Sequence, residues 1–150
     1  MLIYIARHGD AEPFGSGVKD SERALTVRGR NEVSAVARKM QAAGESASLV
    51  VASPFRRAQE TAEIFAESWQ VASAIETEPA ITPSGNIEIA EQFLRSLEVP
   101  SVLLASHMPT VSYLTNKLVP AAQMMSFGTA NVAKIHLSDQ GAELIQFYQP

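Results

Sequence analysis

Residues 2–9 read Leu-Ile-Tyr-Ile-Ala-Arg-His-Gly, and they set the architecture expected of the whole chain. Five apolar residues without polar alternation are typical of a strand that is covered on both faces. A cation, an imidazole and a glycine follow at the carboxyl end of this strand, where open α/β sheets place their ligands. The stretch predicts a buried strand with a polar site at its mouth.

Two further apolar runs, residues 48–52 and 101–105, have the same character. Helical stripes separate and follow these runs. In residues 26–43 apolar side chains recur at helical spacing before Gly44, and comparable stripes occupy 58–69, 89–97 and 111–118. This alternation predicts an α/β fold, a three-layer α/β/α sandwich around a mostly parallel sheet.

The remaining segments complete this outline. Residues 73–81 predict a short edge strand. Residues 131–137 alternate in polarity, a turn follows at 138–141, and residues 144–148 are again β-rich, which indicates a C-terminal β-hairpin. Residues 12–23 form a long polar loop containing Pro13, Gly15 and Gly17, and loops of this length often carry function.

Length and composition limit the possible classes of protein. The 150 residues suit one domain, 1–150, and the net charge of -4 argues against nucleic-acid or anionic-membrane partners. The chain has no cysteine, which excludes disulfides and thiolate chemistry and suits the reducing cytoplasm. No apolar run approaches the ~20 residues of a membrane span. We expect a soluble, cytoplasmic monomer.

The second apolar run ends in Ser53-Pro54-Phe55-Arg56-Arg57. Serine before proline predicts a helix start, with Ser53 as N-cap and Pro54 at the first helical position. Arg56 and Arg57 then lie in the first turn, where the helix dipole disfavours cations. A bound anion would compensate this cost. The alternative is that both arginines are solvated surface residues.

The third run is followed by Ser106-His107, so three strand ends carry ionisable groups. Because the carboxyl ends of parallel strands share one edge of a sheet, we expect Arg7, His8, Arg57 and His107 to converge. A metal site with further ligands from Asp10 or Glu12 is disfavoured, since neighbouring guanidiniums repel a divalent cation. His136 lies in an alternating strand, where no functional role is indicated.

Five short fragments are distributed in order along nearly the whole chain. They are Arg7-His8-Gly9-Asp10-Ala11, Leu25-Thr26 with Gly29, Ser53-Pro54-Phe55 with Arg57-Ala58, Thr82-Pro83 with Gly85, and Ser106-His107 with Pro109. With these fragments the chain resembles the histidine phosphatase (phosphoglycerate-mutase-like) superfamily, especially its small bacterial phosphohistidine phosphatases.

The resemblance implies a phosphoglycerate-mutase-like fold and a site for phosphoryl transfer. It assigns the nucleophile to His8 and the phosphate pocket to Arg7, Arg57 and His107, with Arg56 as a neighbour. A phosphohistidine enzyme intermediate is then hydrolysed by water, and no metal or cofactor is needed. The role of Arg23 is left open.

Larger members of the family use a glutamate to protonate an alcohol leaving group. Ala80 stands at the corresponding place here, and Asp20, Glu22 and Glu78 are possible proton donors or rim residues. An imidazole leaving group, with a conjugate-acid pKa of about 6.5, needs such an acid less than an alkoxide does.

The preferred substrate is therefore a phosphorylated histidine on a protein, such as a histidine phosphotransfer domain or a phosphocarrier protein. Arg57 and His107 are only 50 positions apart, which leaves little room for the inserted cap of larger relatives. The alternatives are a small-molecule phosphomonoesterase of the same superfamily and a phosphohistidine-binding module without turnover.

Overall fold

The computed structural model describes residues 1–150 and is built around one six-stranded sheet. Across the sheet the strands lie in the order β3-β2-β4-β1-β5-β6. The parallel strands are β1 (Leu2–Arg7), β2 (Leu49–Ala52), β3 (Glu76–Thr77) and β4 (Ser101–Ser106). The antiparallel strands are β5 (Val132–Ser138) and β6 (Gly141–Tyr148). The mostly parallel sheet and the C-terminal hairpin are confirmed.

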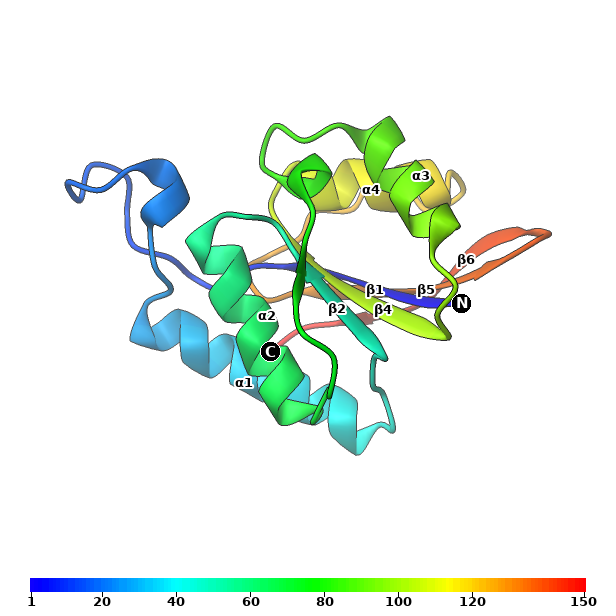
Figure 1. The fold of residues 1–150 in the computed structure, drawn as a ribbon, viewed down its shortest axis with the longest axis horizontal. Coiled ribbons are helices and arrows are strands. Elements are labelled where there is room, and N and C mark those ends of the chain that lie inside the picture. Colours follow the sequence, from blue (N-terminus) through cyan, green and yellow to red (C-terminus); the bar gives the residue numbers. More distant parts are fainter.

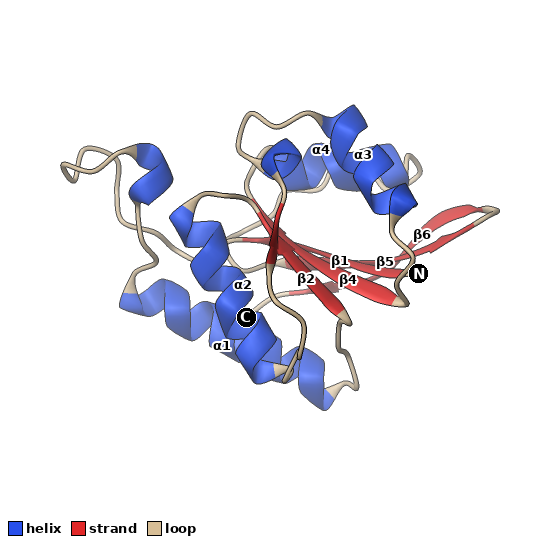
Figure 2. Cartoon of the chain, viewed as in Figure 1, coloured by secondary structure: helices blue, strands red, loops and turns tan.

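The helices form a layer on each face of the sheet (Figures 1 and 2). Helices α1 (Val27–Ala42) and α2 (Arg56–Ser68) pack on one face, and α3 (Ile87–Ser96) and α4 (Thr110–Leu118) pack on the other. This arrangement explains why β1 lacks polar alternation. Ile3 and Ile5 face the α3/α4 core, and Tyr4 and Ala6 face the α1/α2 core.

The ends of α1 agree with the sequence. The side chain of Thr26 accepts a hydrogen bond of 3.0 Å from the Gly29 backbone, and Gly44 has a φ of +83° just after the helix. The first contact satisfies an otherwise free N–H, and the second is a conformation that glycine adopts without a steric penalty.

The predicted start of α2 is wrong by two residues. The helix begins at Arg56, and Phe55 at its N-cap position has an extended backbone. Pro54 has no N–H to donate, and the extended backbone of Phe55 keeps residues 53–55 outside the helix. The Ser53 hydroxyl instead accepts from the Phe55 backbone N–H at 3.3 Å, which is a local turn.

The edge strand is shorter than residues 73–81. Only Glu76–Thr77 pairs with β2, and a 3-10 helix over Pro79–Ile81 follows. Proline cannot donate to a strand ladder, and the Glu78 carboxylate caps the 3-10 helix by accepting from the Ala80 backbone at 2.8 Å. None of the helices is both long and apolar enough to cross a membrane.

Candidate active site

Arg7, His8, Arg57 and His107 lie together at the carboxyl edge of the parallel strands, although the sequence separates them widely. They line one pocket of about 340 Å³. Arg7 ends β1, His8 follows it, and His107 follows β4. Arg57 projects from the first turn of α2. The remaining lining residues are Asp10, Ala11, Phe14, Asp20, Arg23, Pro83, Met108 and Thr129.

The imidazole of His8 is held in one orientation. Its Nδ1 lies 2.6 Å from the carbonyl oxygen of Gly9, which can only accept a hydrogen bond, so Nδ1 carries the proton. The lone pair of Nε2 faces the pocket and accepts from Nε of Arg57 at 3.2 Å. Burial, together with the charges of Arg57 and Arg7, lowers the pKa of His8 to about 4. His8 is therefore a neutral base at pH 7.

Arg57 is buried, and three contacts hold its guanidinium, which leaves two of its five N–H groups without a protein partner. Besides the contact with His8, its Nη1 donates to the Asp20 carbonyl at 2.7 Å, and its Nη2 lies 3.4 Å from the Asp20 carboxylate. Burial lowers the pKa of Arg57, while the Asp20 charge opposes that shift. Arg56, the preceding residue, points to solvent and pairs with Glu60. The structure thus shows that Arg57 and not Arg56 lies in the pocket, a distinction that the residue pattern alone did not make.

Arg7 is held by the segment between α4 and β5. Its Nη1 donates to the Phe127 carbonyl at 2.7 Å, while its Nε is buried without a hydrogen-bond partner. Burial lowers the pKa of Arg7, although arginine stays charged under ordinary conditions. A buried cationic donor without a partner suits an incoming anion.

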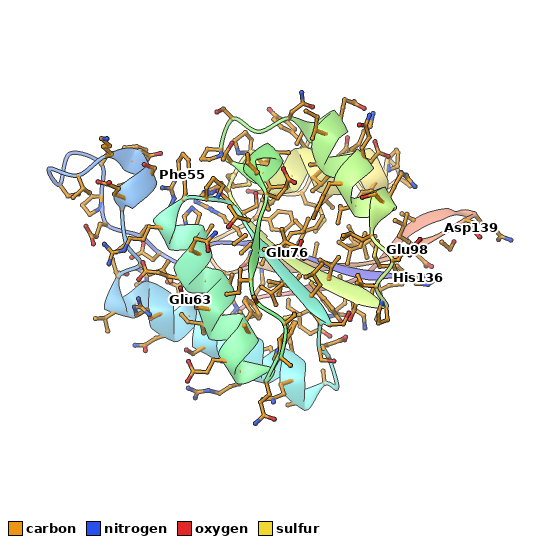
Figure 3. The ribbon with its side chains drawn as sticks, viewed as in Figure 1. Phe55, Glu63, Glu76, Glu98, His136 and Asp139 are labelled. Carbon is orange, nitrogen blue, oxygen red and sulfur yellow. The ribbon has the colours of Figure 1, made fainter.

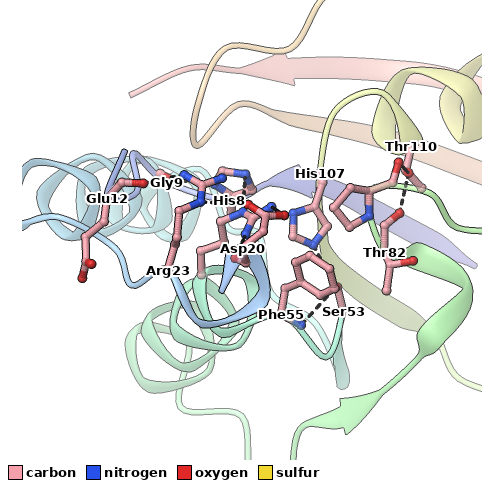
Figure 4. Close-up of polar contacts among 12 residues, drawn as sticks. His8, Gly9, Glu12, Asp20, Arg23, Ser53, Phe55, Thr82, His107 and Thr110 are labelled. Carbon is pink, nitrogen blue, oxygen red and sulfur yellow. Dashed lines mark hydrogen bonds and ion pairs between the residues drawn. The ribbon is translucent and has the colours of Figure 1, made fainter. Parts of the chain in front are cut away.

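His107 presents a second donor that lacks a partner. Its Nε2 lies 2.8 Å from the Ser53 hydroxyl, and its buried Nδ1 makes no hydrogen bond (Figure 4). Burial, followed by the charges of His8 and Arg57, lowers the pKa of His107 to about 2. In the free site this ring is neutral, and its Nδ1 is available to a ligand.

Arg23 also belongs to the pocket, and its guanidinium is held by three contacts. Its Nε donates to the Asp20 carboxylate at 2.8 Å, its Nη1 donates to the Glu12 carbonyl, and the Phe14 ring lies 4.0 Å away. Asp20 therefore bridges Arg23 and Arg57. Partial burial alone would raise the pKa of Asp20, but the hydrogen bond from Arg23 and the Arg57 charge outweigh it, so the pKa is lowered.

Of the three acids considered as proton donors, the structure brings only Asp20 into the pocket. Glu22 is exposed on the 3-10 turn Asp20–Glu22, and the Glu78 carboxylate is occupied in capping the next 3-10 helix. His136 is exposed on the hairpin, at the opposite side of the molecule from Phe55 (Figure 3).

Two residues that support the site were missed by sequence reasoning. Ser53 was predicted as a helix cap and instead contacts His107. Thr61 accepts from the Gly9 backbone at 3.2 Å and donates to the Arg57 carbonyl at 2.7 Å, so it joins the turn after His8 to α2. Its position one helical turn after Arg57 was a signal that could have revealed it.

The structure shows why position 29, one of the residues in the sequence fragments above, is a glycine. A Cβ at this position would lie 2.0 Å from the Asp10 carbonyl oxygen, so only glycine allows α1 to pack against the turn after β1.

Within the structure no group of three or more histidine, aspartate and glutamate side chains is arranged to hold a metal ion.

Comparison with known proteins identifies relatives over the full chain. A model of the histidine phosphatase superfamily (branch 1) matches residues 3–82. The phosphohistidine phosphatase SixA of Escherichia coli K12 is 33% identical over 144 residues, which cover 94% of this chain and 88% of that protein. A SixA homolog of Haemophilus influenzae is 28% identical and covers 97% and 93%.

Solved structures give the same relationship. The structure of the protein histidine phosphatase SixA complexed with tungstate has a TM-score of 0.94 at 31% identity, and the match covers 100% of this chain and 97% of that one. The alpha-ribazole phosphatase of Shigella flexneri has a TM-score of 0.78 at 18% identity, covering 100% and 96%. At that identity the likeness is one of fold alone.

Proposed function

This chain belongs to the histidine phosphatase superfamily, and from that membership we propose that it is a phosphohistidine phosphatase acting on another protein. The observation that carries the proposal is the His8 imidazole. Its Nε2 lone pair is free of protons at neutral pH and faces a pocket lined by three guanidiniums. A neutral imidazole in a cationic pocket is suited to attack phosphorus.

In the first step Nε2 of His8 bonds to phosphorus while the bond from phosphorus to the substrate's imidazole nitrogen breaks. The electron pair stays on the leaving nitrogen, and a ring protonated at its other nitrogen departs as neutral imidazole. The proton on Nδ1 of His8 makes the enzyme's own ring cationic in the intermediate, and the Gly9 carbonyl at 2.6 Å stabilises that charge.

In the second step water attacks phosphorus and the bond to Nε2 breaks. The water's oxygen and both of its protons join the phosphoryl group, which leaves as dihydrogen phosphate. The electron pair of the broken bond returns to Nε2, so His8 regains its neutral form with the proton on Nδ1. Arg7, Arg57 and His107 hold the phosphoryl oxygens in both steps, because Nε of Arg7 and Nδ1 of His107 have no other partner. No metal or cofactor takes part in this scheme.

The acids near the site favour an imidazole leaving group over an alcohol. The pKa of Asp20 is lowered by its arginine partners, so at pH 7 it is a carboxylate and has no proton to give. An alkoxide needs a proton from an acid as it leaves, whereas the transfer here exchanges one imidazole for another. A phosphate ester is therefore the weaker substrate, and Asp20, Glu22 and Glu78 stay outside the proton transfer.

The same proposal covers the setting of the enzyme. One domain, 1–150, without an inserted cap, leaves the site open to a side chain on a protein surface. Histidine phosphotransfer domains and phosphocarrier proteins supply such side chains. The protein acts as a monomer in the cytoplasm, with neither nucleic acid nor membrane as a partner.

The test is a comparison of kcat/KM on a phosphorylated histidine phosphotransfer domain, free phosphohistidine and a panel of sugar phosphates. We expect the phosphohistidine substrates to be preferred. Faster turnover of the sugar phosphates would assign a small-molecule phosphomonoesterase, and binding without phosphate release would assign a binding module. A His8→Ala variant should lose both turnover and acid-labile phosphate labelling, and retained labelling would contradict the role of His8.

A further inference from the structure

The loop between β1 and α1 contributes an exposed aromatic side chain, Phe14, to the lining of the pocket, and the proposed chemistry does not use it. Residues 12–19 of this loop are called the arm. Figure 1 shows this segment in blue at the left, extending away from the sheet and the helices. Residues 13–19 are all exposed.

The arm is attached by backbone hydrogen bonds at its base and has none at its tip. At the base, the backbone N–H of Glu12 donates to the Ala24 carbonyl at 2.9 Å, and Ala11 pairs with Leu25 in a β-bridge. Residues 13–18 make no backbone hydrogen bonds, and no atom lies within 4 Å of a Cβ built on Gly15 or Gly17. The base therefore fixes the position of a tip that nothing else in the chain covers.

The tip carries apolar surface next to a charged group of the site. Phe14 is 77% exposed and Val18 is 44% exposed. One face of the Phe14 ring lies 4.0 Å from the Arg23 guanidinium, which lines the pocket. Aromatic residues and arginines are enriched at the centres of protein interfaces, where their apolar surface leaves water.

We propose that the arm recognises the protein substrate by docking Phe14 and Val18 on an apolar patch beside the substrate's phosphohistidine. This inference rests on the proposed function. The three guanidiniums of the pocket complement the charge of the phosphoryl group, so the phosphorylated side chain enters there. Phe14 lines the edge of that pocket and Val18 does not. A small phosphorylated molecule in the pocket therefore leaves Val18 and most of the exposed Phe14 ring in water, whereas the protein surface around a phosphohistidine reaches both.

The experiment compares kcat/KM on a phosphorylated histidine phosphotransfer domain with kcat/KM on free phosphohistidine. For Phe14→Ser we expect a loss of about tenfold on the domain, as for an aromatic anchor at an interface, and a much smaller loss on the free amino acid. Val18 does not line the pocket, so Val18→Ser should lower kcat/KM only on the phosphotransfer domain. Ile145→Ser is the matched control, because Ile145 is 45% exposed on β6, and neither rate should change.

The outcomes separate the inference from the function on which it rests. Equal losses on both substrates for Phe14→Ser and Val18→Ser would mean that the arm serves the phosphate site alone, and the inference fails. Unchanged rates on the domain would also overturn it. If the unaltered protein releases phosphate from neither substrate, the proposed function itself is wrong.

Discussion

The hydroxyl of Ser53 lies 2.8 Å from Nε2 of His107, and both side chains are almost completely buried. The Ser53 hydroxyl accepts from the Phe55 backbone N–H and has no acceptor for its own proton other than Nε2 of His107, so it donates to Nε2. That arrangement puts the ring proton of neutral His107 on Nδ1, the atom without a partner in the pocket. His107 can then donate to a phosphoryl oxygen without becoming charged.

Replacing Ser53 with alanine should therefore lower kcat by about tenfold, the worth of one lost hydrogen bond that holds a reacting group. The variant should also change the pH dependence of kcat, because the His107 tautomer is no longer fixed. Ser106→Ala is the control, since the buried Ser106 hydroxyl donates to the Ile81 carbonyl at 2.7 Å. If both variants lose activity equally and keep the same pH profile, the effect of Ser53 is only structural.

Arg56 and Arg57 should differ sharply when each is changed to alanine. Arg57 contacts Nε2 of His8 and has only 4% of its side chain exposed, so its loss should lower kcat/KM by about a hundredfold or more. Arg56 has 59% of its side chain exposed and a 3.5 Å pair with Glu60, and its loss should change kcat/KM by less than about twofold. Steady-state rates on free phosphohistidine decide this, and similar losses would contradict the geometry.

The convergence at the sheet edge could be predicted because it depends on topology alone. Parallel strands bring their carboxyl ends together, so Arg7, His8 and His107 had to lie near one another once three buried strands were recognised. The choice between Arg56 and Arg57 depends on where α2 begins. That start was misplaced because the Ser53 hydroxyl contacts His107, 54 residues away, a contact that no local pattern reveals.

Asp20 marks the other limit of sequence reasoning. Nothing in residues 12–23 shows that the loop folds back to lay this carboxylate between Arg23 and Arg57. A polar loop lacks the apolar periodicity from which helices and strands are inferred, and its path depends on contacts with side chains that are distant in sequence. The length of the edge strand was predicted wrongly for a local reason, because Pro79 and the Glu78 cap start a 3-10 helix and end the strand early.

Acid should destabilise the fold through the two pocket histidines. Both have folded-state pKa values, about 4 for His8 and about 2 for His107, below the ordinary value of about 6.5. The unfolded chain therefore binds more protons below that value. The contribution of the two neutral histidines to the free energy of unfolding is therefore fully present above about pH 6.5. It is lost as the pH falls below that value, at about 1.4 kcal/mol per pH unit for each histidine.

Urea unfolding of the unaltered protein and of His107→Gln, from about pH 7 to about pH 5, measures this effect. The free energy of unfolding of the glutamine variant should fall less steeply with acid, because one buried base has been removed. The difference between the two slopes isolates His107 from the many carboxylates that titrate in both proteins. Parallel slopes would show that His107 is not held neutral in the folded state.

In the free site the Asp20 carboxylate forms ion pairs with Arg57 and Arg23, so it competes for these arginines with any anion that enters the pocket. Its carboxylate lies 2.8 Å from Nε of Arg23 and 3.4 Å from Nη2 of Arg57. In Asp20→Asn the negative charge is gone while the shape is kept, and inorganic phosphate should inhibit several-fold more strongly because it meets less repulsion. Glu22→Gln, on the exposed side of the same turn, should leave the inhibition constant of phosphate unchanged. Weaker inhibition of the asparagine variant would mean that the main task of Asp20 is to hold Arg57 in place, which outweighs its competition with the phosphoryl group.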